Sequence, residues 1–223
     1  MSTAKNNPSP VFCKKNRGRV SSKSNKLAAR SERFAQIAKL GEIIFHAQDL
    51  ANLWQIKSKN TLYTALKRYA RKGLLFRVYK GLYSIKPINK INPWLLGIKA
   101  LHGQAYVSCE TILAQAGVIN QNIGNITLIS SKSKKFSVAG HSYYSRKLQD
   151  KYLQQTAGII FKNGIRTAAV ERAAADLLYF NPRYFFDNRK RINWREVKKI
   201  QKLIGYPLTP KRYDFTKSQR SHP

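Results

Sequence analysis

Residues 58–85 read SKNTLYTALKRYARKGLLFRVYKGLYSI, and this stretch contains the clearest structural pattern in the chain. Its first half predicts a helix that is capped by Ser58 or Asn60, runs to about Lys72 and is closed by Gly73. An apolar stripe at the spacing i, i+3, i+4 and i+7 should pack inward. The stripe consists of Leu62, Ala65, Leu66 and Tyr69.

The second half of the stretch changes from a helical to a strand-like pattern. Residues 74–79 and 82–85 are two short β-prone runs. They are joined at Lys80-Gly81, where glycine permits the positive φ of a tight turn. The sequence therefore predicts a β-hairpin directly after the helix.

Two more helical patterns precede the stretch. Apolar and small residues recur at helical spacing from Phe34 to Phe45, behind a plausible N-cap at Ser31, and predict a first amphipathic helix. Leu50, Ala51, Leu53 and Trp54 predict a second helix of about two turns. Small polar residues at 55–60 then form a turn.

Three helices followed by a hairpin are the order of a winged helix-turn-helix. A small helical core with the hairpin serving only as scaffold is the alternative. Basic residues on both the helix and the hairpin tip favour the winged helix, with the third helix in a major groove and the hairpin on the adjacent backbone. Asn60 and Arg68 are the best candidates for base readout, because their paired hydrogen-bonding groups suit adenine and guanine edges. The predicted DNA contacts are Lys57, Lys59, Asn60, Tyr63, Thr64, Lys67, Arg68, Arg71, Arg77, Tyr79 and Lys80.

Charge is the strongest global signal of the composition. The 42 lysines and arginines face only 10 acidic residues, which leaves a net charge of +32. Residues 1–90 carry +17 of this excess and residues 91–223 carry +15. A chain of this kind needs a polyanion, and nucleic acid is favoured over acidic lipid or an acidic protein.

The 223 residues suffice for two domains of α+β class. Residues 1–30 are expected to form a basic arm that follows phosphates, enters a minor groove or stays solvated, and residues 31–86 to form the winged helix-turn-helix. A polar stretch with two prolines at 86–93 predicts the linker. A mixed α/β domain over 93–207 and a basic tail over 208–223 complete the organisation.

The second domain alternates helical and strand-like patterns. Helices are predicted over about 93–101, 108–117, 167–180 and 193–204, and strands over 105–107, 126–129, 136–138, 142–145 and 158–161. The last helices combine the apolar stripe Trp194, Val197, Ile200 and Leu203 with a basic face of Arg189-Lys190-Arg191, Lys198, Lys199 and Lys202. That face is either solvated or adds affinity for DNA or an acidic partner.

The sequence offers little for catalysis, so we expect no enzyme, no metal and no cofactor. The histidines are widely separated, and no phosphate-binding glycine loop occurs. Glu171 and Asp176 are the closest acidic pair in an apolar context, but five helical residues place them roughly 140° apart. Glu171 suits a helix start and could pair with Arg172 or Arg166; a contact surface for a toxin is the alternative.

Cys13 and Cys109 form no metal-binding pair and indicate a reducing cytoplasm. No signal peptide and no membrane span are expected. The predicted location is therefore the bacterial cytoplasm, at the nucleoid.

Several segments together resemble a known family. Residues 66–75 (LKRYARKGLL) and 77–85 (RVYKGLYSI) resemble the recognition helix and wing of AbiEi-type antitoxins and their transcriptional-regulator relatives. Residues 106–111 (YVSCET), 126–129 (ITLI) and 169–179 (AVERAAADLLY) are similar to parts of their second domain. The resemblance spans roughly residues 35–205.

The resemblance implies an antitoxin of a type IV toxin-antitoxin (abortive infection) system. Such a protein represses its own operon at inverted repeats and opposes a nucleotidyltransferase-like toxin encoded beside it, with or without physical contact. The rival interpretation of the residues is an RNA-binding or ribosome-associated basic protein, which the charge and the tyrosine-rich strands permit.

Overall fold

A computed structural model describes residues 32–208, and these residues form a mixed α+β structure, as predicted. The chain divides into two compact units, residues 1–42 and 43–223. The predicted basic arm, the N-cap Ser31, Cys13 and the predicted tail beyond Leu208 lie outside the described residues.

In the first unit residues 32–39 are helical, and Gly41 follows with a φ of +66°. The prediction that this helix continues to Phe45 is wrong. Residues Ile44–His46 form strand β1, which pairs antiparallel with β3 (Leu82–Ser84). The partner strand, distant in sequence, satisfies the backbone groups that a helix would have satisfied locally.

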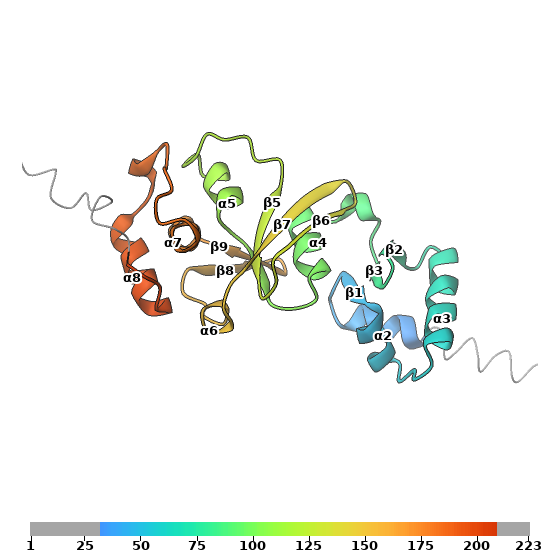
Figure 1. Cartoon of the computed structure of the whole chain (residues 1–223). Coiled ribbons are helices and arrows are strands. Elements are labelled where there is room, and N and C mark those ends of the chain that lie inside the picture. The colour runs from blue at the N-terminus through green and yellow to red at the C-terminus, as the bar shows by residue number, and fades with distance from the viewer. Residues whose placement is uncertain (1–31, 209–223) are drawn as a thin grey trace, which may run out of the picture. The chain divides into compact units, whose positions relative to one another are not determined.

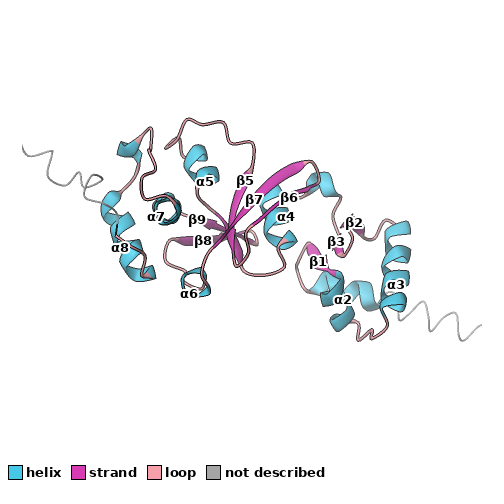
Figure 2. Cartoon of the chain, viewed as in Figure 1, coloured by secondary structure: helices cyan, strands magenta, loops and turns pink. Residues whose placement is uncertain are grey.

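The second unit begins with β1 and then contains the helices and hairpin predicted from residues 58–85. Helix α2 (Ala47–Leu53) is followed by α3 (Lys59–Arg71), whose N-cap is Ser58 rather than Asn60. Strand β2 (Phe76–Tyr79) and β3 form the hairpin, and Gly81 has the expected positive φ of +95°. The three strands make one sheet in the order β1-β3-β2 (Figure 2).

The core of this second unit does not break at the predicted linker. Ile44 and Leu82 belong to the same buried cluster as Ile91 and Leu95, which lie on either side of Asn92. The apolar residues on both sides of Pro93 therefore share one core with the small sheet, although the sequence around them is polar. The functional division at 86–93 stays a prediction.

A six-stranded sheet organises the rest of the second unit, with the order β6-β7-β5-β4-β9-β8 (Figure 1). Strand pairs β5/β7 and β4/β9 are parallel, and the other neighbours are antiparallel. The strands are β4 (Ala105–Val107), β5 (Ile126–Ser130), β6 (Lys134–Val138), β7 (His141–Lys147), β8 (Ile159–Lys162) and β9 (Ile165–Ala168). The helices are α4 (Pro93–Ala100), α5 (Glu110–Gln115), α6 (Asp150–Leu153), α7 (Val170–Phe180) and α8 (Trp194–Ile204), with 3-10 turns η1 (Ile88–Lys90) and η2 (Arg189–Arg191).

Two elements depart from the predicted pattern. The helix predicted from Thr167 begins only at Val170, because residues 165–168 form strand β9 between β8 and β4. Helix α6 is one short turn that has no apolar repeat to reveal it. The other predicted helices and strands of this region are confirmed to within a few residues.

Helix α7 lies at the centre of the helical layer, where it packs against α5, α8 and β9. Its side chains from Arg172 to Leu178 are all buried. Helix α4 approaches β7 closely at Gly97, since a Cβ atom there would lie 2.4 Å from the ring of Tyr143. Among residues 32–208, no helix is long and apolar enough to cross a membrane.

Candidate nucleic-acid interface

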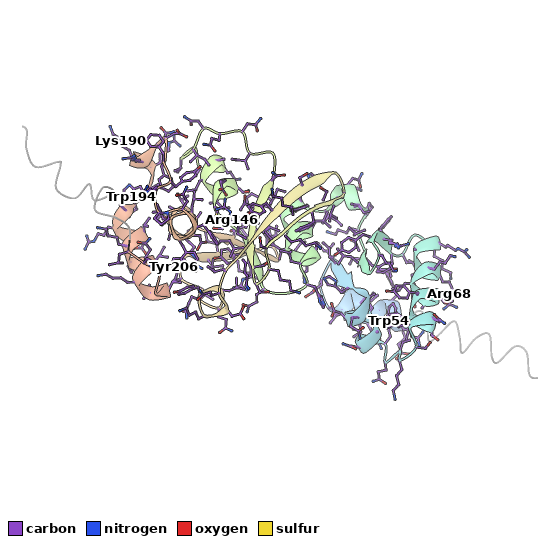
Figure 3. The ribbon with its side chains drawn as sticks, in the orientation of Figure 1. Trp54, Arg68, Arg146, Lys190, Trp194 and Tyr206 are labelled. Atoms are coloured by element: carbon purple, nitrogen blue, oxygen red, sulfur yellow. The ribbon has the colours of Figure 1, made fainter. Side chains whose placement is uncertain are left out.

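Most of the side chains that the sequence predicted as DNA contacts lie on α3, and the others lie just before it or on the hairpin. All the predicted contacts are exposed except Arg68, which is half-buried. The buried face of the same helix consists of Leu62, Ala65, Leu66 and Tyr69, as predicted. Figure 3 shows Arg68 directed away from the side on which Trp54 lies. The described structure therefore separates one apolar face from one polar face along the whole helix.

Packing and capping hold α3 in place. The indole of Trp54, which follows α2, lies 5.5 Å from the ring of Tyr69 on α3. At the start of the helix, Ser58 Oγ accepts a hydrogen bond from the backbone N–H of Thr61 at 3.4 Å. At its end, Gly73 takes the left-handed conformation with φ +68°, and the next N–H donates to Tyr69 O. The exposed face is thus carried by a helix with both ends fixed.

The hairpin is joined to the helices by backbone. The N–H of Ala47, the first residue of α2, donates to the carbonyl of Gly81 in the hairpin turn at 2.8 Å. The β2 strand has a bulge between Arg77 and Tyr79. A bulge re-aims the side chains beside it, and Arg77, Tyr79 and Lys80 are all exposed.

Tyr79 is the one predicted contact whose polar group is already engaged. Its hydroxyl donates to the backbone carbonyl of Ala100 at 3.2 Å, and partial burial raises the pKa of this phenol. The hydroxyl therefore stays protonated and donates its proton to the hydrogen bond with Ala100. Tyr79 can offer a nucleic acid its ring and a hydroxyl oxygen that accepts.

The electrostatics of this region have one sign. No acidic residue occurs between Asp49 and Glu110, whereas residues 57–86 contain nine lysines and arginines. Asp49 itself faces the imidazole of His102, with 3.7 Å between the carboxylate and Nε2. Like charges held on one fixed surface attract a polyanion over roughly a Debye length, about 8 Å at physiological salt.

A histidine pair lies beside the same small sheet. His46 Nε2 is 2.6 Å from the carbonyl of Lys99, and the rings of His46 and His102 are 4.0 Å apart. Burial lowers the pKa of His46, and the charges of His102 and Lys99 act in the same direction, against the raising effects of the hydrogen bond with the Lys99 carbonyl and of Asp49. His46 is therefore neutral at physiological pH and adds no charge to the exposed surface.

A second polar cluster, which the sequence did not reveal, is completely buried beside the six-stranded sheet. The carboxylate of Asp176 on α7 accepts hydrogen bonds from Tyr106 Oη, Ser108 Oγ, Arg172 Nε and Tyr206 Oη, at 2.7–3.0 Å. Arg172, one of the two partners suggested for Glu171, pairs instead with Asp176 one helical turn away. Asp176 cannot belong to a toxin-contacting surface, since its side chain is 0% exposed.

This Asp176 cluster is saturated with hydrogen bonds. The Arg172 guanidinium also donates to the carbonyls of Gln155 and Ala157 and to Tyr106 Oη. Burial raises the pKa of the Asp176 carboxyl, against the opposing effect of Arg172 and the hydroxyl donors. Burial also raises the pKa values of both phenols, so they remain protonated donors. With its polar groups engaged inside the chain, the cluster ties segments together.

The part of the chain that the structure describes contains no group of three or more histidines, cysteines, aspartates or glutamates that could hold a metal ion. Cys109 is buried beside β4, and burial raises the pKa of its thiol well above the ordinary value. A protonated, inaccessible thiol is a poor nucleophile. The exposed α3–hairpin surface is therefore the best candidate for a functional site.

Comparison with known proteins gives a distant structural likeness. No family model matches the chain, and no curated protein matches it. Among solved structures, the chain is similar to the crystal structure of the RV2827C protein from Mycobacterium tuberculosis, with 12% sequence identity and a TM-score of 0.46. The similarity covers 81% of this chain and 72% of that one.

Proposed function

We propose that the chain is a sequence-specific DNA-binding protein with a winged helix-turn-helix. Helix α2, the turn at 54–58 and helix α3 correspond to the helix-turn-helix, and the β2–β3 hairpin corresponds to the wing. The helix over residues 32–39 precedes these elements in the chain. The observation that carries the proposal is the exposed face of α3, which is basic and polar, lacks any acid and is fixed at both ends.

The chemistry of this face suits duplex DNA. A helix of this length fits the major groove, where Asn60 and Arg68 offer paired donors and acceptors to adenine and guanine edges. Lys59, Lys67 and Arg71 act on phosphates, and Arg77 and Lys80 of the hairpin reach adjacent backbone. The hairpin turn is hydrogen-bonded to the start of α2, which fixes the wing to the first helix of the proposed helix-turn-helix.

The more specific role rests on the resemblance described above. We propose that the protein is the AbiEi-type antitoxin of a type IV toxin-antitoxin pair and represses its own operon at inverted repeats. Co-expression tests this role: the chain is expected to restore growth of cells that express the nucleotidyltransferase-like protein encoded beside it. A neighbouring gene of another kind, or no restoration of growth, would contradict the antitoxin role while leaving DNA binding intact.

Replacement of two cations on α3 tests DNA binding. The double variant Lys67→Ala/Arg68→Ala is expected to bind the duplex upstream of its own gene at least about 5-fold more weakly, because it loses one base contact of about 1–3 kcal/mol and one phosphate contact. Electrophoretic mobility shifts or fluorescence anisotropy would measure this change. Lys67 is exposed and Arg68 is half-buried, so circular dichroism of the variant should accompany the titration to verify that the fold is retained.

The matched control removes the same charge elsewhere. Lys134 and Lys135 are exposed on β6, an edge strand of the six-stranded sheet. Lys134→Ala/Lys135→Ala should change promoter affinity only slightly. Equal losses for the two double variants would indicate binding by net charge alone, and tighter binding of structured RNA than of the promoter duplex would favour the RNA-binding alternative.

A further inference from the structure

A short segment before α8 combines exposed aromatic and basic side chains far from α3 in the sequence. Residues 183–195 (RYFFDNRKRINWR) contain five arginines and lysines and one acid. Phe185 is 64% exposed, although phenylalanine is usually buried. The guanidinium carbon of Arg189 lies over its ring, 5.0 Å from the centroid.

The segment is held firmly, which makes the exposure of Phe185 a fixed feature of the surface. The next residue, Phe186, is completely buried, and its ring contacts Trp194 at 5.6 Å. Trp194 Nε1 donates to the carbonyl of Arg189 at 3.1 Å, which fixes the residue that stacks on Phe185. The phenyl ring is therefore displayed from an anchored backbone.

Contacts with the end of α5 complete the anchoring. Asn188 Nδ2 donates to the carbonyl of Gly117 at 2.7 Å, and the backbone N–H of Asn120 donates to Asp187 Oδ2 at the same distance. Asp187, the one acid of the segment, is thus engaged within the chain. Arg183, Lys190 and Arg195 are exposed, and Figure 3 shows Lys190 at the periphery of the molecule.

An exposed aromatic ring with a stacked guanidinium among cations matches one class of ligand. Unpaired nucleotides stack their bases on aromatic rings and arginine planes, while lysines and arginines neutralise the flanking phosphates. A base inside a duplex is already stacked on both faces. An acidic protein could also pack on the ring, but the stacked guanidinium and phenyl group offer the flat platform on which bases stack.

We propose that Phe185 and Arg189, with Arg183 and Lys190 beside them, form a second nucleic-acid site that binds single-stranded nucleic acid. A base stacks on Phe185 and Arg189, and the neighbouring cations contact phosphates. This site is separate from the α3–hairpin surface and goes beyond duplex recognition. A chain that holds duplex DNA at one surface and unpaired nucleotides at the other can link a gene to a single-stranded transcript.

The experiment uses the full chain and labelled strands of about 12 nucleotides, within the usual size range of single-stranded sites. Each strand is prepared as RNA, as DNA and as an abasic DNA backbone with the same number of phosphates. Phe185→Ala is expected to bind the base-bearing strand that the wild-type chain prefers about 5- to 100-fold more weakly, as loss of one stacked base predicts. Affinity for the abasic strand should be unchanged.

Phe161→Ala is the matched control, because Phe161 on β8 is also an exposed phenylalanine, at 71%. It should bind every strand as the wild type does. Phe185→Trp should retain affinity, and its fluorescence should fall when the base-bearing strand binds, since stacked bases quench indole. Tighter binding of the RNA strand would identify RNA as the ligand, and tighter binding of the DNA strand would identify single-stranded DNA.

Two results would overturn the proposal: equal affinities of Phe185→Ala and Phe161→Ala for base-bearing strands, or an equal loss on the abasic strand. The α3 variant Lys67→Ala/Arg68→Ala separates this site from the proposed function. It should lose duplex binding and keep the preference for base-bearing over abasic strands.

Discussion

At the residue scale, Asp176 accepts hydrogen bonds from an unusually large set of donors for one buried carboxylate. Four donors from three separate segments converge on its two oxygens. Taking such a group out of water is costly, and the hydrogen bonds offset that cost only while every partner is present. The Asp176 cluster therefore fixes how β4, α7 and the segment after α8 pack together.

Asp176→Ala should destabilise the protein by about 3–5 kcal/mol, because it leaves the Arg172 charge buried without its partner. Urea denaturation followed by circular dichroism would measure the change. Asp150→Ala, at the exposed start of α6, is the control and should cost less than about 1 kcal/mol. If Asp176→Ala lowered the free energy of unfolding as little as the control does, the cluster would not hold these segments together.

At this scale, the sequence predicts the exposed face of α3 but neither the partners of Asp176 nor the site at Phe185. The exposed face of α3 was predictable, since it lies opposite an apolar stripe within one helix. The partners of Asp176 were not, because Tyr106 and Tyr206 are 70 and 30 residues away from it. The site at Phe185 was missed for another reason. Its aromatic and basic pattern is visible, but only the structure tells the exposed Phe185 from the buried Phe186.

At the element scale, the path of the chain after α3 depends on the conformation of Gly73. Gly73 lies just past its last turn with a φ of +68°, where a side chain would meet no neighbouring atom within 4 Å. The strain of any other residue there would come from the backbone alone. The exit of the chain from α3 toward the hairpin is set at this position.

Gly73→Ala is expected to cost about 1–2 kcal/mol of stability, the energy of placing a Cβ in the left-handed region. Gly103→Ala is the matched control, because Gly103 also has open space around it but no positive φ. It should be neutral or slightly stabilising. Thermal or urea unfolding of the two variants provides the comparison, and equal stabilities would refute the assigned role of Gly73.

Elements with local signals were predictable, and elements defined by distant partners were not. The α3–hairpin order follows from helical spacing and one glycine. Residues 44–45 and 167–168 were predicted as helix, because apolar residues or alanines continue the spacing of adjacent helices. Each pair instead belongs to a strand, since β1 pairs with β3 and β9 pairs with both β4 and β8.

At the scale of the whole molecule, the net charge of +32 is spread over the chain, whereas the proposed duplex contacts are local. Fixed cations on α3 and the hairpin would release counterions from DNA when they bind phosphates. A salt titration distinguishes these cations from the general excess, because each released counterion contributes to the slope of log K against log salt.

Lys67→Ala/Arg68→Ala should lower the magnitude of that slope by about 1 for duplex DNA, since the loss of one phosphate contact reduces it by roughly 0.9. Anisotropy titrations between about 50 and 200 mM KCl cover the useful range. Lys134→Ala/Lys135→Ala should leave the slope unchanged. If the β6 variant lowered the slope as much as the α3 variant, the duplex would be held by the six-stranded region as well.

The position of Tyr206 after α8 has a consequence for the order in which the protein matures on the ribosome. Strand β4 and helix α7 are synthesised first, but Asp176 lacks one of its donors until residue 206 has left the exit tunnel. The hydrogen bonds that fix α3 and the hairpin need nothing from so late in the chain. Synthesis would therefore release the α3–hairpin region before the Asp176 cluster of the six-stranded region can be completed.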